Sequence, residues 1–377
     1  MRTCNEMSGR SEADSFLTLA TLIALITPAA SACAQGDAYP GSSWEPVDDP
    51  ASLGWSIEGL GQARAYADSI NTAAVMIIHR GDLVAAWGET TAKFNIHSVR
   101  KSLLSAMVGI YEAEGTLSLN STLEELAIDD RLGLTESERQ ATVGDLLGSR
   151  SGIYHPANLV GHAASEGWPE RGSHAPGTFW FYSNWDFNAM GAVFEQETSR
   201  GVFEAFEDLI AEPIGMEDYQ ASDGLYEPRS GWGGAQGRSV SDYPAYVFRM
   251  SARDMARFGL LYLRMGRWED RQVVPREWVD RTTRTDRSIG DYGGHEFFWW
   301  IGIDGRLYPG VDVGDSAYAA HGAGGHYITI MPEHDMVVVH RVNTNARTIP
   351  IGGTNPGTSV SAAQYGALLE LILAARG

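Results

Sequence analysis

Runs of apolar residues near both ends of the chain predict strands, and the stretch between them has mostly helical periodicity. Residues 73–87 predict a hairpin that turns at Arg80-Gly81-Asp82, because β-rich apolar runs flank a turn signal. Residues 327–342 predict a second hairpin, with its turn at 332–335. A further strand is expected at 298–303.

Apolar spacing and end signals predict helices at 60–70, 98–114, 142–147, 189–197, 203–210, 251–265 and 359–375. The helix at 98–114 is apolar on most sides, which indicates burial. The helix at 251–265 starts with Ser-Ala-Arg-Asp, which resembles a capping box with Asp in place of Glu. Residues 224–246, rich in Gly, Ser and aromatic residues, predict a long loop.

This order of elements indicates an α+β chain in which both ends build one domain. Residues 35–110 and 285–377 are expected to form a sheet domain. Residues 111–284 are expected to form a mostly helical domain inserted between the two parts. Because binding sites lie preferentially between domains, we expect the functional site where these two meet.

The first 34 residues predict an export signal. Residues 16–26 form an apolar run that is shorter than the roughly 20 residues needed to span a bilayer, which suits a signal peptide. Ala30-Ser31-Ala32 and Ala32-Cys33-Ala34 both offer cleavage sites, and Cys33 is a candidate lipid anchor. A buried or membrane-anchoring segment is the alternative. We expect an exported protein, periplasmic or secreted, without a membrane span after processing.

Charge and cysteine content exclude several classes of protein. The formal net charge of -20, from 28 basic and 48 acidic residues, should repel nucleic acid and anionic membranes. Two cysteines, Cys4 and Cys33, cannot build a disulfide scaffold or a Cys-based zinc site. No G-x-S-x-G, P-loop, dinucleotide-binding glycine pattern or H-E-x-x-H occurs. His321 and His326 are five residues apart, which suits no familiar metal-ligand spacing.

The lysines single out one motif. Only two of the 28 basic residues are lysines, Lys93 and Lys101, and Lys101 completes the S-x-x-K sequence Ser98-Val99-Arg100-Lys101. Residues i and i+3 share a helix face, so Lys101 can reach the Ser98 hydroxyl. Burial and the helix start both lower a lysine pKa, which would let the amine accept the serine proton. The alternative is a capping serine followed by a surface lysine.

Two further stretches carry candidate chemistry. Tyr182-Ser183-Asn184 places a phenol where a nearby ammonium would lower its pKa and let it relay protons, and the Asn184 amide could hold the lysine and a substrate carbonyl. The Gly-rich stretch 320–326 would let a substrate approach the backbone closely. An N–H there would complete an oxyanion hole with the Ser98 N–H. A core tyrosine with a turn asparagine, and a simple Gly-rich turn, are the alternatives.

The order of these three motifs resembles the serine β-lactamase and penicillin-binding protein superfamily. The resemblance is greatest to class C β-lactamases, their related esterases and D-aminopeptidases, and the 6-aminohexanoate-dimer hydrolases. It extends from about residue 54 to the end, and further stretches typical of these proteins are 97–102, 145–147, 151–152, 176–178, 212–216 and 250–254. It implies a β-lactamase/transpeptidase-like fold, in which helices flank an antiparallel sheet beside a helical domain.

The resemblance also implies roles for individual residues. Ser98 would be the acylated nucleophile, and Lys101 and Tyr182 would share the acid and base work. Asn184 would position them, and the N–H groups of Ser98 and Ala323 would form the oxyanion hole. No metal or organic cofactor is implied, and the expected partner is a small ester or amide.

One departure from the family affects the expected substrate. Related β-lactamases carry Lys-Thr-Gly where this chain has Ala320-His321-Gly322, unless a deletion brings His321 into the lysine position. Without that lysine, we expect an esterase or amidase acting on a neutral or cationic acyl group. The alternatives are a β-lactamase or D-alanyl carboxypeptidase, and a binding or sensor domain that is acylated without turnover.

Overall fold

The computed structural model describes residues 37–159, 167–229, 237–285, 287–290, 293–344 and 359–376. The predicted signal segment, its cleavage sites and Cys33 lie outside the described residues. Within the part that the structure describes, no helix is both long and apolar enough to cross a bilayer.

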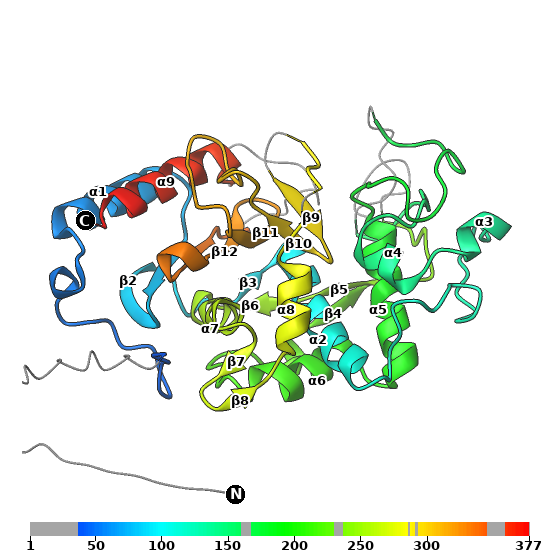
Figure 1. Ribbon diagram of the computed structural model, residues 1–377, viewed down its shortest axis with the longest axis horizontal. Coiled ribbons are helices and arrows are strands. Elements are labelled where there is room, and N and C mark those ends of the chain that lie inside the picture. The colour runs from blue at the N-terminus through cyan, green and yellow to red at the C-terminus, as the bar shows by residue number, and fades with distance from the viewer. Residues whose placement is uncertain are drawn as a thin grey trace, which may run out of the picture. The chain divides into compact units, whose positions relative to one another are not determined.

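A seven-stranded antiparallel sheet, built from both ends of the chain, forms the frame of the protein (Figure 1). Its order is β2-β1-β13-β12-β11-β10-β9. The strands are β1 (Ala74–His79), β2 (Asp82–Gly88), β9 (Gly294–Glu296), β10 (Trp299–Ile301), β11 (Tyr318–Gly322), β12 (His326–Met331) and β13 (Met336–Arg341). Both predicted hairpins and the expected α+β fold are confirmed, whereas β9 escaped prediction.

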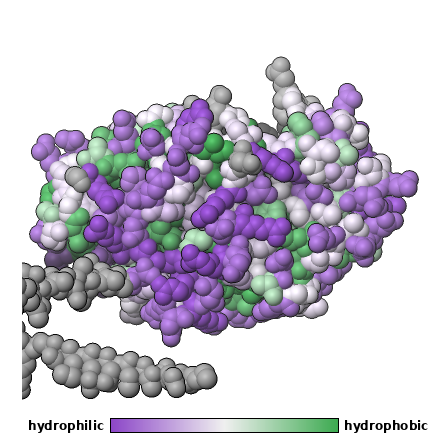
Figure 2. Space-filling view, viewed as in Figure 1, coloured by the Kyte–Doolittle hydropathy of each residue, from purple (hydrophilic) through white to green (hydrophobic). Residues whose placement is uncertain are grey.

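Helices pack on both faces of this sheet. Helices α1 (Ile57–Ser69) and α9 (Ala362–Ala374) pack on one face, where Val75 and Ile77 point into their shared apolar core. Helix α7 (Ala252–Leu263) packs on the other face against β12 and β13. Met76 and Ile78 point toward that second core, as the alternation of a strand requires. The face seen in Figure 2 is mainly hydrophilic, with apolar residues in small separate patches.

The remaining helices come from the middle of the chain. They are α2 (Arg100–Ala113), α3 (Glu136–Arg139), α4 (Val143–Leu147), α5 (Asn184–Thr198), α6 (Val202–Phe206) and α8 (Arg276–Thr282). Helix α6 continues into a π-helical turn at Glu207–Ala211. Three short strand pairs complete the fold: β3 (Phe94–Asn95) with β6 (Arg249–Met250), β4 (Leu225–Glu227) with β5 (Ala245–Val247), and β7 (Arg267–Trp268) with β8 (Arg271–Gln272).

One apolar core joins the sheet to the helices of the middle segment. Buried residues of α2, α5, α6 and α7 belong to the same cluster as the inner faces of β12 and β13. Helix α7, which we placed in the helical domain, therefore packs on the sheet. The division into two domains at residues 110 and 285 stays a prediction.

The start of α7 differs from the predicted capping box. The Ser251 hydroxyl accepts the Asp254 N–H at 3.2 Å, as expected. The buried Asp254 carboxylate does not return a bond to Ser251. It accepts the N–H groups of residues 217, 218 and 219 instead, and so ties a distant loop to the helix.

Candidate active site

Ser98 lies in a tight turn that leads into the buried helix α2. A 3₁₀ turn at His97–Val99 precedes the helix, so the predicted helix is confirmed with a tighter first turn. His97 has a φ of 50°, an unfavourable value for a residue with a side chain. Its N–H donates to Asn95 Oδ1 at 2.7 Å, and this bond stabilises the turn that presents Ser98.

The side chains of Ser98, Lys101 and Tyr182 meet at one point. Lys101 Nζ lies 2.7 Å from Ser98 Oγ and 2.7 Å from Tyr182 Oη. Lys101 is only 2% exposed, so the alternative of a surface lysine is wrong. Its Nζ also lies 4.7 Å from the centre of the Tyr182 ring and 4.3 Å from that of Phe187. Apolar ring surface therefore encloses the amine.

Burial sets the charge state of the lysine. Desolvation lowers the pKa of Lys101 well below its ordinary value, and the neighbouring Arg100 guanidinium lowers it further. Arg100 is held over the Tyr246 ring at 4.3 Å and donates to Asn188 Oδ1 at 3.3 Å. A neutral amine has a free lone pair, so Lys101 can accept the proton of the Ser98 hydroxyl.

Tyr182 differs from our expectation. We predicted that the nearby lysine would lower the pKa of the phenol, but burial raises the pKa of Tyr182. The hydrogen bond with Ser98 and the charge of Arg100 oppose the rise without cancelling it. The physical reason is desolvation, because a fully buried site disfavours the charged phenolate. The phenol therefore keeps its proton at neutral pH.

Asn184 lies at the first position of α5, two residues beyond Tyr182. It is half-buried, and its amide makes no hydrogen bond within the described residues. The structure thus does not join Asn184 to Lys101, although the motif predicted that contact. Ser183 caps the helix by accepting the Asp186 N–H at 3.3 Å.

The end of β11 lies against the Ser98 turn. A Cβ added to Gly322 would lie 2.4 Å from the Ile96 carbonyl oxygen, so only glycine allows this approach. Gly324 and Gly325 follow with φ values of 87° and 106°, and they turn the chain into β12. The Gly-rich stretch therefore lies close against the backbone before Ser98, with Ala323 next to the contact, and the approach of a substrate to it stays a prediction.

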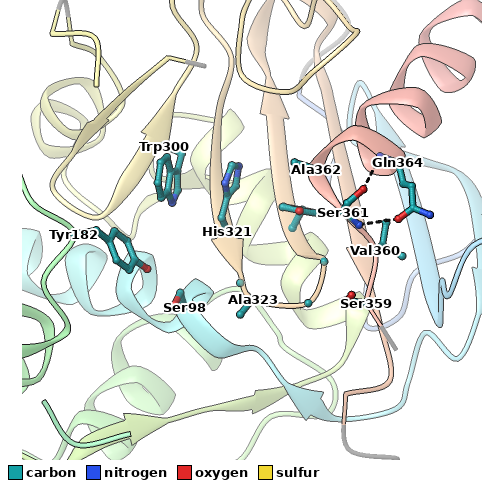
Figure 3. Close-up of a pocket in the computed structure, with 14 residues that line it drawn as sticks. Ser98, Tyr182, Trp300, His321, Ala323, Ser359, Val360, Ser361, Ala362 and Gln364 are labelled. Carbon is teal, nitrogen blue, oxygen red and sulfur yellow. Dashed lines mark hydrogen bonds between the residues drawn. The ribbon is translucent and has the colours of Figure 1, made fainter. Parts of the chain in front are cut away.

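Ser98, Tyr182 and residues 321–325 line one cavity of about 730 Å³ (Figure 3). Ser98 and Ala323 lie on the same side of it, and Trp300 and His321 form a neighbouring wall (Figure 3). The cavity extends to residues 359–362 and Gln364, at the start of α9, and also reaches Tyr327. Sequence reasoning missed the contribution of α9, because no local signal places a helix start beside a serine so distant in the chain.

His321 is uncharged in this wall. Its ring stacks on Trp300 and on Tyr308, with ring centres 5.1 Å apart in each pair, and its Nε2 lies 3.0 Å from Tyr308 Oη. Burial lowers the pKa of His321 to about 3. His321 therefore carries no positive charge that could replace the lysine of the related β-lactamases.

The other histidine of the Gly-rich stretch belongs to a buried network. His326 Nδ1 accepts from Arg341 Nε at 3.0 Å, and Thr344 Oγ1 lies 3.2 Å from His326 Nε2 and 2.9 Å from His97 Nε2. The network links the turn before Ser98 to the last strand of the sheet. Within the described residues, no group of three His, Cys, Asp or Glu side chains is placed to hold a metal ion.

Of five aromatic residues near the motifs, three pack in the core: Tyr154, Trp185 and Trp299. The other two, Trp180 and Trp300, line cavities. Core packing therefore explains most of this aromatic content.

Comparisons with known proteins agree with this fold. The family model described as Beta-lactamase matches residues 58–349. No curated protein sequence matches the chain significantly.

Three solved structures illustrate the likeness in fold. A Bacillus anthracis protein named as a 6-aminohexanoate-dimer hydrolase has a TM-score of 0.60 at 17% identity, over 89% of this chain and 86% of its own. A penicillin-binding protein from Bacillus halodurans has 0.56 at 15% identity, over 82% and 98%. EstCE1, a hydrolase with promiscuous acyltransferase activity, has 0.58 at 15% identity, over 86% and 98%. The fold and the family match together show that the chain belongs to the beta-lactamase family.

Proposed function

We propose that this protein is a serine hydrolase that cleaves ester or amide bonds of small molecules through an acyl-enzyme on Ser98. The observation that carries the proposal is the placement of Lys101 Nζ, buried and 2.7 Å from both Ser98 Oγ and Tyr182 Oη. A nucleophile within hydrogen-bond distance of a neutral base is the arrangement that covalent catalysis needs.

The reaction follows from these positions. Ser98 Oγ attacks the substrate carbonyl carbon while its proton passes to Lys101 Nζ. The N–H groups of Ser98 and Ala323 stabilise the oxyanion that forms. Tyr182 donates a proton to the leaving alcohol or amine and is reprotonated from Lys101. Water then attacks the acyl carbon and gives a proton to Lys101 Nζ, the bond from the acyl carbon to Ser98 Oγ breaks, and Lys101 returns the proton to Ser98 Oγ as the acid leaves.

The lining of the cavity favours an uncharged acyl group. No acidic, lysine or arginine side chain is among the described residues that line it, and His321 is neutral. A substrate carboxylate would find no cation there to offset its desolvation. An esterase or amidase therefore fits this cavity better than a β-lactamase or D-alanyl carboxypeptidase.

The test is covalent labelling with a fluorophosphonate, measured by intact mass and peptide mapping. The expected result is one adduct on Ser98, absent from Ser98→Ala, followed by steady turnover of a short nitrophenyl ester in preference to a chromogenic cephalosporin. Labelling of Ser98→Ala at another serine would refute the assignment. A stoichiometric burst without turnover would favour a binding or sensor domain.

A further inference from the structure

A second cavity lies beside the Ser98 cavity, and its chemistry differs. It has a volume of about 480 Å³ and is lined by Arg150, Gly167, Phe179, Trp180, Phe181 and residues 287–289. The ring of Trp180 lies 6.4 Å from that of Trp300, which lines the Ser98 cavity. The two cavities are therefore neighbours across this pair of tryptophans.

Within the described residues, the two arginines of the second cavity have no anionic partner. Neither Arg150 nor Arg287 forms an ion pair with an acidic side chain of that part of the chain, whereas Arg284, close by in the sequence, pairs with Asp280 at 2.9 Å. The Nε atom of Arg150 is buried without a hydrogen-bond partner in the described part of the chain. Leaving a buried donor unpaired costs free energy. A ligand that supplies an acceptor would recover that cost.

Two acidic side chains, Asp145 and Glu296, lie near this pair but form no ion pair with it within the described residues. The Asp145 carboxylate is already engaged, because it accepts the N–H and O–H groups of Thr142 at 2.9 and 2.8 Å. Glu296, at the end of β9, interacts with the charges of Arg150 and Arg287 but forms no ion pair with either, and burial raises its pKa. Within the part of the chain that the structure describes, Arg150 and Arg287 therefore have no carboxylate at ion-pair distance, although the charges of Asp145 and Glu296 act on Arg150 from further away.

Aromatic rings form much of the rest of the lining. Phe179 is 40% exposed, and its ring stacks on His174 with centres 3.9 Å apart. Trp180 and Phe181 continue the aromatic surface along the same segment. An aromatic wall beside cations suits a ligand that is flat at one end and anionic at the other.

We infer that this second cavity binds a carboxylate attached to a flat apolar group, with the carboxylate on Arg150 and Arg287 and the flat group against residues 179–181. The inference goes beyond the proposed hydrolysis, because binding here requires no reaction at Ser98. In this arrangement the charged end of a ligand lies outside the uncharged Ser98 cavity.

Titration calorimetry with naphthalene-2-carboxylate and its carboxamide tests this site. We expect the carboxylate to bind and the carboxamide to bind at least tenfold more weakly. Arg150→Gln and Arg287→Gln should each weaken carboxylate binding, roughly 10- to 150-fold for the partly buried Arg150, because a charge-assisted hydrogen bond contributes roughly 1.5–3 kcal/mol. Arg64→Gln, an exposed arginine of α1, is the matched control and should bind as the wild type does.

Equal binding of the two compounds, or wild-type affinity in Arg287→Gln, would overturn the inference. Arg287 is exposed, so its variant decides the matter even if Arg150→Gln fails to fold. The rate of 4-nitrophenyl acetate hydrolysis then shows whether the carboxylate belongs to a larger substrate or to a separate regulatory ligand. An unchanged rate at saturating naphthalene-2-carboxylate identifies a subsite for part of a larger substrate, and a changed rate that Arg287→Gln abolishes identifies a regulatory ligand. Ser98 labelling reports on the proposed hydrolysis independently.

Discussion

Replacing Lys101 with arginine should remove activity while keeping a positive charge and similar length. Lys101 Nζ has two partners at 2.7 Å and two aromatic rings within 5 Å, so the wider guanidinium cannot take its place without moving them. Arginine also stays protonated, so it cannot accept the Ser98 proton. Loss of a positioned general base lowers rates roughly 10²–10⁴-fold, and we expect a fall of about 10³ in kcat/KM.

The assay is hydrolysis of 4-nitrophenyl acetate together with the rate of fluorophosphonate labelling, after circular dichroism has shown that the variant is folded. Lys93→Arg is the matched control, because Lys93 is the other lysine and its Nζ pairs with Asp223 at 2.7 Å, a contact that arginine can retain. Lys101→Met tests the same role without a buried charge, should Lys101→Arg fail to fold. A folded Lys101→Arg enzyme within tenfold of the wild-type rate would refute the reasoning.

Four further results are expected. Tyr182→Phe should keep substrate binding and lower kcat roughly 10²–10⁴-fold, and an unchanged kcat would assign the proton relay to another group. Gly322→Ala should lower the free energy of unfolding, measured in urea, by about 1–3 kcal/mol and impair turnover, because its Cβ would lie 2.4 Å from the Ile96 oxygen. Gly61→Ala is the control, because its Cβ would meet no atom within 4 Å. Because neutral Lys101 is the active form and its pKa is lowered, kcat/KM should rise with pH to a plateau reached well below pH 10.5; a rise only above that pH would contradict a neutral amine. His321→Lys should raise kcat/KM for mono-4-nitrophenyl glutarate about tenfold relative to 4-nitrophenyl valerate, and an unaltered ratio would show that the wall does not set acyl preference.

Local patterns predicted the elements that carry the site. Alternation and turn residues located the hairpin of β1 and β2 and that of β12 and β13, because strand period and turn chemistry are properties of neighbouring residues. The spacing of Ser98 and Lys101 placed both side chains on one face for the same reason, and their 2.7 Å contact agrees with it.

Features that depend on distant residues escaped prediction. The pKa of Tyr182 depends on how completely other elements bury it, so a motif could not give its direction. Asp254 looked like a capping residue, but its three N–H partners belong to a loop more than thirty residues earlier. The start of α9 lines the Ser98 cavity only because the sheet order brings the two ends of the chain together.

That sheet order also determines when the site can exist during folding. Strand β13 lies between β1 and β12, so Ala74 pairs with Arg341 across most of the chain. Contacts this distant in sequence form slowly, because a long loop must close before any pairing compensates for the lost entropy. The wall of the Ser98 cavity is complete only after β11, β12 and α9 have joined the earlier strands. A chain still being synthesised therefore holds the serine and the lysine without the complete cavity beside them.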